Sequence, residues 1–228
     1  MPAPSTFNSE VILHRLGPER LASYLNDSDN DLERALDLYA WNAQIAAAFL
    51  EDLGRLEVVL RNQFDAALTA LVASRGSLQP WYDHHSLFLG KHSRNALRDI
   101  RKAKQRATDH GKRAMIHSEV ISELNFGFWR FLCSPRYHTT MWVPVLAAQF
   151  PNSPSPGHAA QLRADVQSRM KTLHFLRNRV AHHKPIHRRA LADDAAMIFE
   201  LAQWMCLDTH AWMTGLSRIP VLLASRPA

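Results

Sequence analysis

The stretch LYAWNAQIAAAFLEDLGRLEVVLRNQFDAALTAL, residues 38–71, predicts a single long helix. Its large apolar side chains recur every three or four residues, which places them on one face of a helix that packs against a core. They are Leu38, Trp41, Ile45, Phe49, Leu53, Leu56, Leu60, Phe64, Leu68 and Leu71. The acidic and amide side chains of residues 29–31 can cap its first turn, and Gly76 can end it.

The same period recurs in other parts of the chain. We expect a short helix that begins at Pro18, and helices over residues 93–110, 117–132, 142–150, 159–182 and 193–214. No segment shows a sustained alternation of period two, so the sequence does not favour a sheet. It predicts an all-α fold, with one helical domain over residues 1–215 and a loose C-terminal tail over residues 216–228.

The overall charge is basic. Lys and Arg total 27 against 21 Asp and Glu, which gives a net charge of +6 and a pI near 9.7. This balance favours polyanionic partners, chiefly nucleic acid or an anionic membrane surface, although it also occurs in soluble proteins that bind none. The first five residues carry no positive and apolar signal pattern, and no apolar run approaches the length of a membrane span. We therefore expect a cytoplasmic protein with no membrane partner.

Several common sites are missing from the sequence. It contains no phosphate-binding glycine loop, no HExxH and no GxSxG. His182, His183 and His187 are close enough to suggest zinc, but no nearby cysteine or carboxylate completes four ligands, so we predict no metal and no cofactor. Four tryptophans could stack on RNA bases, but their apolar neighbours favour core packing instead. They are Trp129, Trp142, Trp204 and Trp212.

Residues 173–185, LHFLRNRVAHHKP, form the most informative segment for function. Pro185 ends the helix near His182 or His183, because proline disfavours the helical conformation of the residue before it. Asn178 and His182 are four residues apart and share one helical face. Arg177 lies to the side, but its long side chain can reach the same space.

These three residue types suit the cleavage of RNA. His182 can transfer protons near neutral pH, and Arg177 can stabilise charge on a phosphate through paired hydrogen bonds. Asn178 can orient either the phosphate or His182. The alternative is a basic cluster that merely ends a helix, with the histidine capping the last carbonyls. Spacing alone favours that simpler interpretation.

Residues 177–182, RNRVAH, resemble the Abi-like (abortive infection) protein family of the HEPN ribonuclease superfamily. Its hallmark is an arginine, a polar residue, a few variable residues and a histidine. His183, Pro185 and Ile186 look like the Abi-like extension of this motif, whereas Lys184 stands where the family usually has an acidic residue. The likeness extends over most of the chain. It includes LEVVLRN at residues 56–62, LNFGFW at residues 124–129, Trp142, Pro144 and Phe150-Pro151.

The resemblance implies an all-α helical bundle of the HEPN type with additional N-terminal and central helices. It also implies a homodimer in which two motifs line one cleft, so that two copies of His182 could divide the acid and base roles. The implied activity is metal-independent endoribonuclease cleavage of single-stranded or looped RNA by 2′-hydroxyl transesterification. Such a protein would act in phage defence, or as a toxin with an antitoxin partner. The alternative is a non-catalytic helical module that binds RNA or protein.

The resemblance makes Arg177, Asn178 and His182 the expected catalytic residues. Supporting roles are expected for His183, Glu57, Arg61 and Asn62. Glu57 and Arg61 are four residues apart, so they could instead form a simple surface salt bridge.

The strongest cluster of cations lies within residues 91–113. Four of its side chains can line one helical face and follow an RNA backbone: Arg94, Arg98, Arg101 and Lys102. The alternative is a solvated helix face with no ligand.

Overall fold

The computed structural model describes residues 7–89 and 93–227, and the described residues form helices and connecting segments without any strand. The all-α prediction is confirmed. The first five residues, on which the expectation of no signal peptide rested, lie outside the described ranges. Among the described residues, no helix combines the length and the hydropathy that crossing a bilayer requires.

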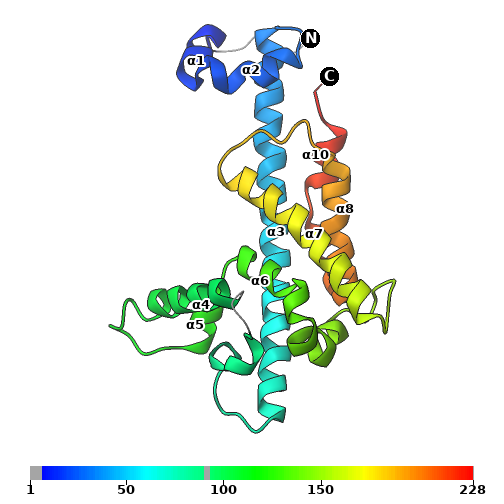
Figure 1. Ribbon diagram of the computed structural model, residues 1–228. Helices are drawn as coiled ribbons and strands as arrows, with labels where there is room; N and C mark the ends of the chain where they lie inside the picture. The colour runs from blue at the N-terminus through cyan, green and yellow to red at the C-terminus, as the bar shows by residue number, and fades with distance from the viewer. Residues whose placement is uncertain (1–6, 90–92, 228) are drawn as a thin grey trace.

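A single helix, α3 (Leu32–Ser74), runs the length of the molecule (Figure 1). Its 43 residues make it about 65 Å long. The side chain of Asp31 caps its first turn by accepting from the Arg34 N–H at 3.1 Å. Gly76 follows its end in the left-handed region, with φ of 78°. All ten apolar residues of the predicted stripe are buried, which confirms the long helix and the face it packs.

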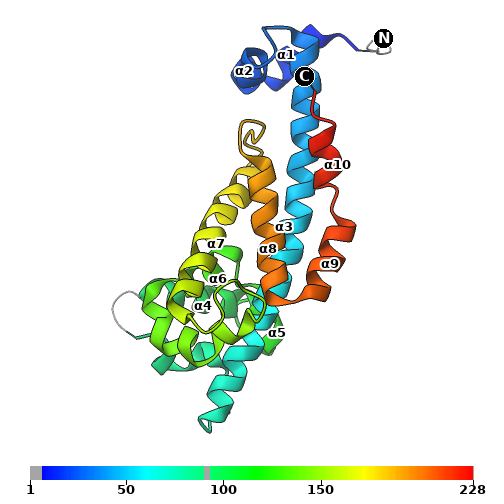
Figure 2. The same cartoon turned by 90° about the vertical axis from the view of Figure 1, so that its right-hand side faces the viewer.

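The other helices pack along α3 at different heights (Figures 1 and 2). The N-terminal pair lies at one end: α1 (Ser9–Leu16) and α2 (Pro18–Asn26). The helices α4 (Arg94–Ala107) and α5 (His117–Ser122) project to one side, and α6 (Phe126–Leu132) lies between them and α7 (Ala159–Ala181). The chain then returns along α3 through α8 (Leu191–Met205), α9 (Leu207–Leu216) and α10 (Ile219–Ala224). Short 3-10 turns connect these helices: η1 (Trp81–Asp83), η2 (His85–Leu87), η4 (Pro135–Tyr137) and η6 (Ala147–Gln149).

Two predicted helices are each divided in two. The helix expected over residues 117–132 stops after Ser122, and α6 starts anew because the Asn125 side chain accepts from the Phe128 N–H at 3.1 Å. An asparagine that bonds the backbone in this way competes with a continuous helix. The helix expected over residues 193–214 breaks at Cys206, whose extended backbone lets α9 pack back on α8.

Two further predictions were wrong. The helix expected over residues 142–150 is replaced by the end of a wider π-helix, η5 (His138–Leu146), which contains Pro144, and by η6. The loose tail expected over residues 216–228 contains α10. Ile219 of α10 is buried, and the Trp41 indole N–H donates to the carbonyl of Leu222 at 2.7 Å.

The four tryptophans that were expected to pack in the core differ in burial. Trp129, Trp142 and Trp204 are buried, as their apolar neighbours predicted. The prediction was wrong for Trp212, which is 54% exposed on α9, a helix in which only Met213 is buried.

Candidate active site

The predicted motif lies at the C-terminal end of α7. Leu173, Leu176 and Val180 are buried on the face of α7 that packs on α3, as expected. The helix ends at Ala181, and His182 is its C-cap residue with an exposed side chain. The core therefore anchors α7 and leaves the motif histidine at the surface.

A tight turn follows the helix. The His183 N–H donates to the carbonyl of Val180 at 2.9 Å, and the Lys184 N–H donates to that of Arg179 at 2.8 Å. This is the Schellman arrangement, in which the left-handed position is usually glycine. His183 occupies it with φ of 52°, at a cost of about 1–2 kcal/mol. The Arg179 side chain braces the turn by donating to the carbonyl of Pro185 at 2.5 Å.

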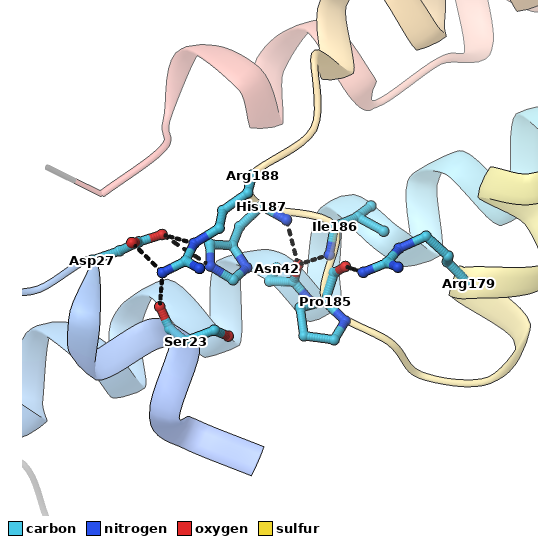
Figure 3. Close-up of polar contacts among 8 residues, drawn as sticks. All are labelled: Ser23, Asp27, Asn42, Arg179, Pro185, Ile186, His187 and Arg188. Atoms are coloured by element: carbon cyan, nitrogen blue, oxygen red, sulfur yellow. Dashed lines mark hydrogen bonds and ion pairs between the residues drawn. The ribbon is translucent and has the colours of Figure 1, made fainter. Parts of the chain in front are cut away.

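The segment after the motif, residues 183–190, is here called the strap. It lies against α2 and α3 rather than projecting into solvent (Figure 3). The buried Asn42 side chain of α3 accepts from two strap amides, Ile186 N–H at 2.8 Å and His187 N–H at 3.0 Å. Because a buried oxygen holds two consecutive backbone donors, the position of the turn at His182 is fixed to the central helix.

His187 is the most deeply buried polar group of the strap, at 1% exposure. Its ring stacks on Tyr24 with centroids 4.4 Å apart, and its Nε2 lies 3.1 Å from a carboxylate oxygen of Asp27. Arg188 binds the same carboxylate at 2.6 and 2.8 Å. Burial lowers the pKa of His187, and the negative charge of Asp27 opposes that shift only in part.

We expect this lowered pKa to make the fold less stable in acid. Above about pH 6.5, His187 is neutral in both the folded and the unfolded chain, and its contribution is fully present. As the pH falls toward the lowered folded pKa, the unfolded chain binds the proton first and stability is lost, by up to about 1.4 kcal/mol per pH unit. Urea unfolding at a series of pH values measures this slope. His187→Phe, which keeps the stack on Tyr24, should show a smaller slope, and equal slopes would contradict this account.

Beside the buried face of α7, charged and polar side chains from three helices lie close together. We call them the crossing cluster: Glu57 and Arg61 of α3, Arg130 of α6, and His174, Arg177 and Asn178 of α7. Burial raises the pKa of Glu57, while the charges of Arg177 and then Arg61 and a hydrogen bond from the Phe126 backbone N–H act to lower it. Glu57 thus balances part of the positive charge of the cluster.

Arg177 makes no hydrogen bond or ion pair with any residue in the described ranges. Its guanidinium acts on Glu57 and on His174 through charge alone. Asn178, by contrast, is held, because its side-chain nitrogen lies 3.2 Å from Nε2 of His174. Arg61 and Arg130 likewise form no hydrogen bond or ion pair with the described residues, and the Nε atom of each is buried without a partner. The cluster therefore contains arginine donors that are free to bind an anion.

His182 lies on the rim of a groove of about 630 Å³ between α2, α3 and the end of α7. The floor is the part of α3 from Asn42 to Leu50, where three alanines line it. Arg20, Tyr39 and residues 182–184 line its sides, and Arg20 joins α2 to the end of α7 by donating to the backbone carbonyl of His183. None of the described residues that line the groove is acidic. An apolar floor with a cationic rim suits an anionic ligand that also has a flat apolar part.

The groove and the crossing cluster follow one another along the junction of α3 and α7. Leu50 lines the groove, and Glu57 lies seven residues further on, two turns along the same face of α3. On α7, Val180 lines the groove and Arg177 lies three residues before it. Within one chain, Arg177 and His182 therefore occupy neighbouring parts of this junction rather than one pocket.

A family model described as Abi-like protein matches residues 19–188, which is well over half of the chain. The chain belongs to the Abi-like protein family. The matched region runs from α2 to the strap and so contains the groove and the crossing cluster. Comparison with curated proteins and with solved structures gave no match.

In this Abi-like protein, most of the expected site residues lie near one another. Glu57, Arg61, Arg177 and Asn178 are in the crossing cluster. The positive charge of Arg177 lowers the pKa of Glu57 more than the charge of Arg61 does. Asn62 is exposed and makes no polar contact with that cluster within the described residues. The basic side chains expected to bind RNA are all exposed on α4: Arg94, Arg98, Arg101 and Lys102. Of these, Arg98 lies 3.5 Å from Asp99, and the others form no ion pair with the described residues.

Sequence reasoning missed several residues that shape the site of the Abi-like protein. Arg20 and Asn42 reach the motif from α2 and α3, where Arg20 donates to the backbone carbonyl of His183. No local pattern marks such long-range contacts. Arg130 was missed for the same reason, but His174 stands four residues before Asn178, a spacing that could have singled it out. Among the described residues, no group of three or more metal-ligating side chains is placed to hold an ion.

Proposed function

We propose that this Abi-like protein is a metal-independent endoribonuclease of the HEPN type that cleaves single-stranded or looped RNA. One observation carries the proposal. The exposed His182 lies on a groove with an apolar floor and a cationic rim, next to an arginine, Arg177, that has no hydrogen-bonding partner among the described residues. Family membership suggests a part in abortive infection, so we place the activity in phage defence or in a toxin–antitoxin pair.

The size and lining of the groove suit a nucleotide. A volume of about 630 Å³ lies within the usual range for small-ligand sites. The alanine floor can receive the face of an unstacked base, while Arg20 and Lys184 on the rim attract its phosphate. Unstacked bases occur in single strands and loops, which is why these are the expected substrates. The exposed cations of α4 would add salt-dependent affinity for the strand beyond the cut.

The proposed reaction is an internal transesterification. A base takes the proton of the 2′-hydroxyl, and the 2′-oxygen forms a new bond to the adjacent phosphorus. The bond from phosphorus to the 5′-oxygen breaks as that oxygen receives a proton from an acid. His182 carries out proton transfer, Arg177 stabilises the negative charge on the phosphate, and Asn178 positions it. A homodimer would supply a second His182, so that one imidazole serves as base and the other as acid.

The ends of the products test the proposal. Incubated with labelled single-stranded RNA in the presence of a chelator, the protein should produce 2′,3′-cyclic phosphate and 5′-hydroxyl ends. The same strand with a 2′-O-methyl group at the cut site should stay intact, because it lacks the nucleophile. Cleavage that requires a divalent metal, or that leaves 5′-phosphate ends, would contradict the proposal. Binding without any product would favour a non-catalytic RNA-binding module.

A further inference from the structure

The side chain of His174 lies against the proposed catalytic residues without being part of the recognised motif. His174, Asn178 and the C-cap His182 follow one another at intervals of four residues along α7. Nε2 of His174 is 3.2 Å from the side-chain nitrogen of Asn178. The asparagine therefore has a partner within its own helix that can fix the orientation of its amide.

The ring of His174 is itself held in place by α6. It stacks on Phe126, with ring centroids 6.1 Å apart and planes at 17°. The next residue of α6, Gly127, also lies close to the ring, since an added Cβ would be 3.2 Å from Nε2 and 3.5 Å from Cε1 of the imidazole. A side chain at residue 127 would have to displace the ring by a few tenths of an ångström, so glycine lets the start of α6 pack against the imidazole without moving it.

The surroundings of His174 also decide which partner donates. Burial, and then the positive charges of Arg130 on α6 and Arg177 on α7, lower the pKa of His174. A neutral imidazole with its proton on Nδ1 presents Nε2 as an acceptor, so the Asn178 amide donates to it. This uses one N–H of Asn178 and leaves its second N–H and its carbonyl oxygen for a ligand.

We infer that His174 is a positioning residue that holds the Asn178 amide in the orientation needed to bind the RNA phosphate, which rests on the proposed function. His174 does not touch the reacting atoms. Its contribution is made through Asn178 and depends on the acceptor atom Nε2. The role should therefore appear in kcat more than in KM, because a misaligned amide weakens transition-state stabilisation more than it weakens strand binding.

Two substitutions separate the acceptor from the packing of the ring. His174→Phe keeps a ring against Phe126 but removes the acceptor, whereas His174→Gln places an acceptor oxygen near the position of Nε2 and removes the ring. We expect His174→Phe to lower kcat about 10- to 100-fold with little change in KM, and His174→Gln to recover most of that loss. Melting temperatures of both variants identify any loss of folding.

A double-variant cycle completes the test. If His174 acts through Asn178, His174→Phe should have almost no further effect in a chain that already carries Asn178→Ala. Multiplied losses would overturn the inference, as would a His174→Gln variant as slow as His174→Phe. If the wild-type protein cleaves no RNA, the proposed function fails, and nitrogen NMR of the histidines becomes the readout. A signal from His174 with Nδ1 protonated that changes in Asn178→Ala supports the contact, and an unchanged signal overturns it.

Discussion

Replacing His182 with alanine is expected to slow RNA cleavage about 1,000-fold, because a positioned imidazole contributes roughly 100- to 10,000-fold by proton transfer. The loss should appear in kcat, since His182 is exposed on the groove rim and the cations that bind the strand remain. Single-turnover cleavage of a labelled RNA measures it directly. Folding should be unaffected, because the His182 side chain makes no hydrogen bond within the described residues.

The matched control for this variant is His158→Ala. His158 is also exposed and lies at the opposite end of α7, where its side chain forms no cap. It should cleave RNA at the wild-type rate. Equal rates for His182→Ala and the wild-type protein would remove His182 from the mechanism. Equal losses for the two histidine variants would point to a general effect on charge or folding.

Asn42→Ala is expected to destabilise the fold by about 2–4 kcal/mol. The substitution leaves the buried N–H groups of Ile186 and His187 without their acceptor, and each unsatisfied donor costs about 1–3 kcal/mol. It also frees the strap that fixes the turn at His182, so cleavage should fall even at temperatures at which the variant remains folded. Urea unfolding gives the first quantity, and a cleavage assay well below the melting temperature gives the second.

Gln44→Ala provides the comparison, because Gln44 is exposed on the same helix, two residues further on. Its free energy of unfolding should stay within about 0.5 kcal/mol of the wild-type value. If Asn42→Ala behaves like Gln44→Ala, the strap is not anchored as described. If Asn42→Ala is unstable but cleaves normally when folded, the anchor is structural only.

The central helix could be predicted almost completely from the sequence, and its partners less so. An apolar side chain every three or four residues over 34 positions is compatible with a single long helix. The ten apolar residues of the stripe from Leu38 to Leu71 were therefore placed correctly on its buried face. The breaks at Asn125 and Cys206 were missed, because they depend on a local side-chain acceptor and on how α9 packs on α8. Helix α10 was missed because it is short and is stabilised by contact with Trp41, far away in the sequence.

The candidate site, too, could be predicted from the sequence only in part. The end of α7 and its buried face followed from Pro185 and the apolar spacing, and the structure has both. The relation between Arg177 and His182 was harder to predict. Five residues correspond to about 140° of rotation, so Arg177 is directed toward Glu57 while His182 is directed toward the groove. Only the tertiary packing of α2, α3 and the strap shows that the two parts adjoin.

The proposed cleavage requires Arg177 and His182 to act on one phosphodiester. The most direct measurement is a structure of the protein bound to a short RNA with a 2′-O-methyl group at the cut site, which binds but cannot react. We predict that the scissile phosphate contacts the guanidinium of Arg177, that an imidazole of His182 lies within hydrogen-bonding reach of its 2′- or 5′-oxygen, and that a base occupies the groove. An RNA bound only along α4, with the end of α7 empty, would contradict the account.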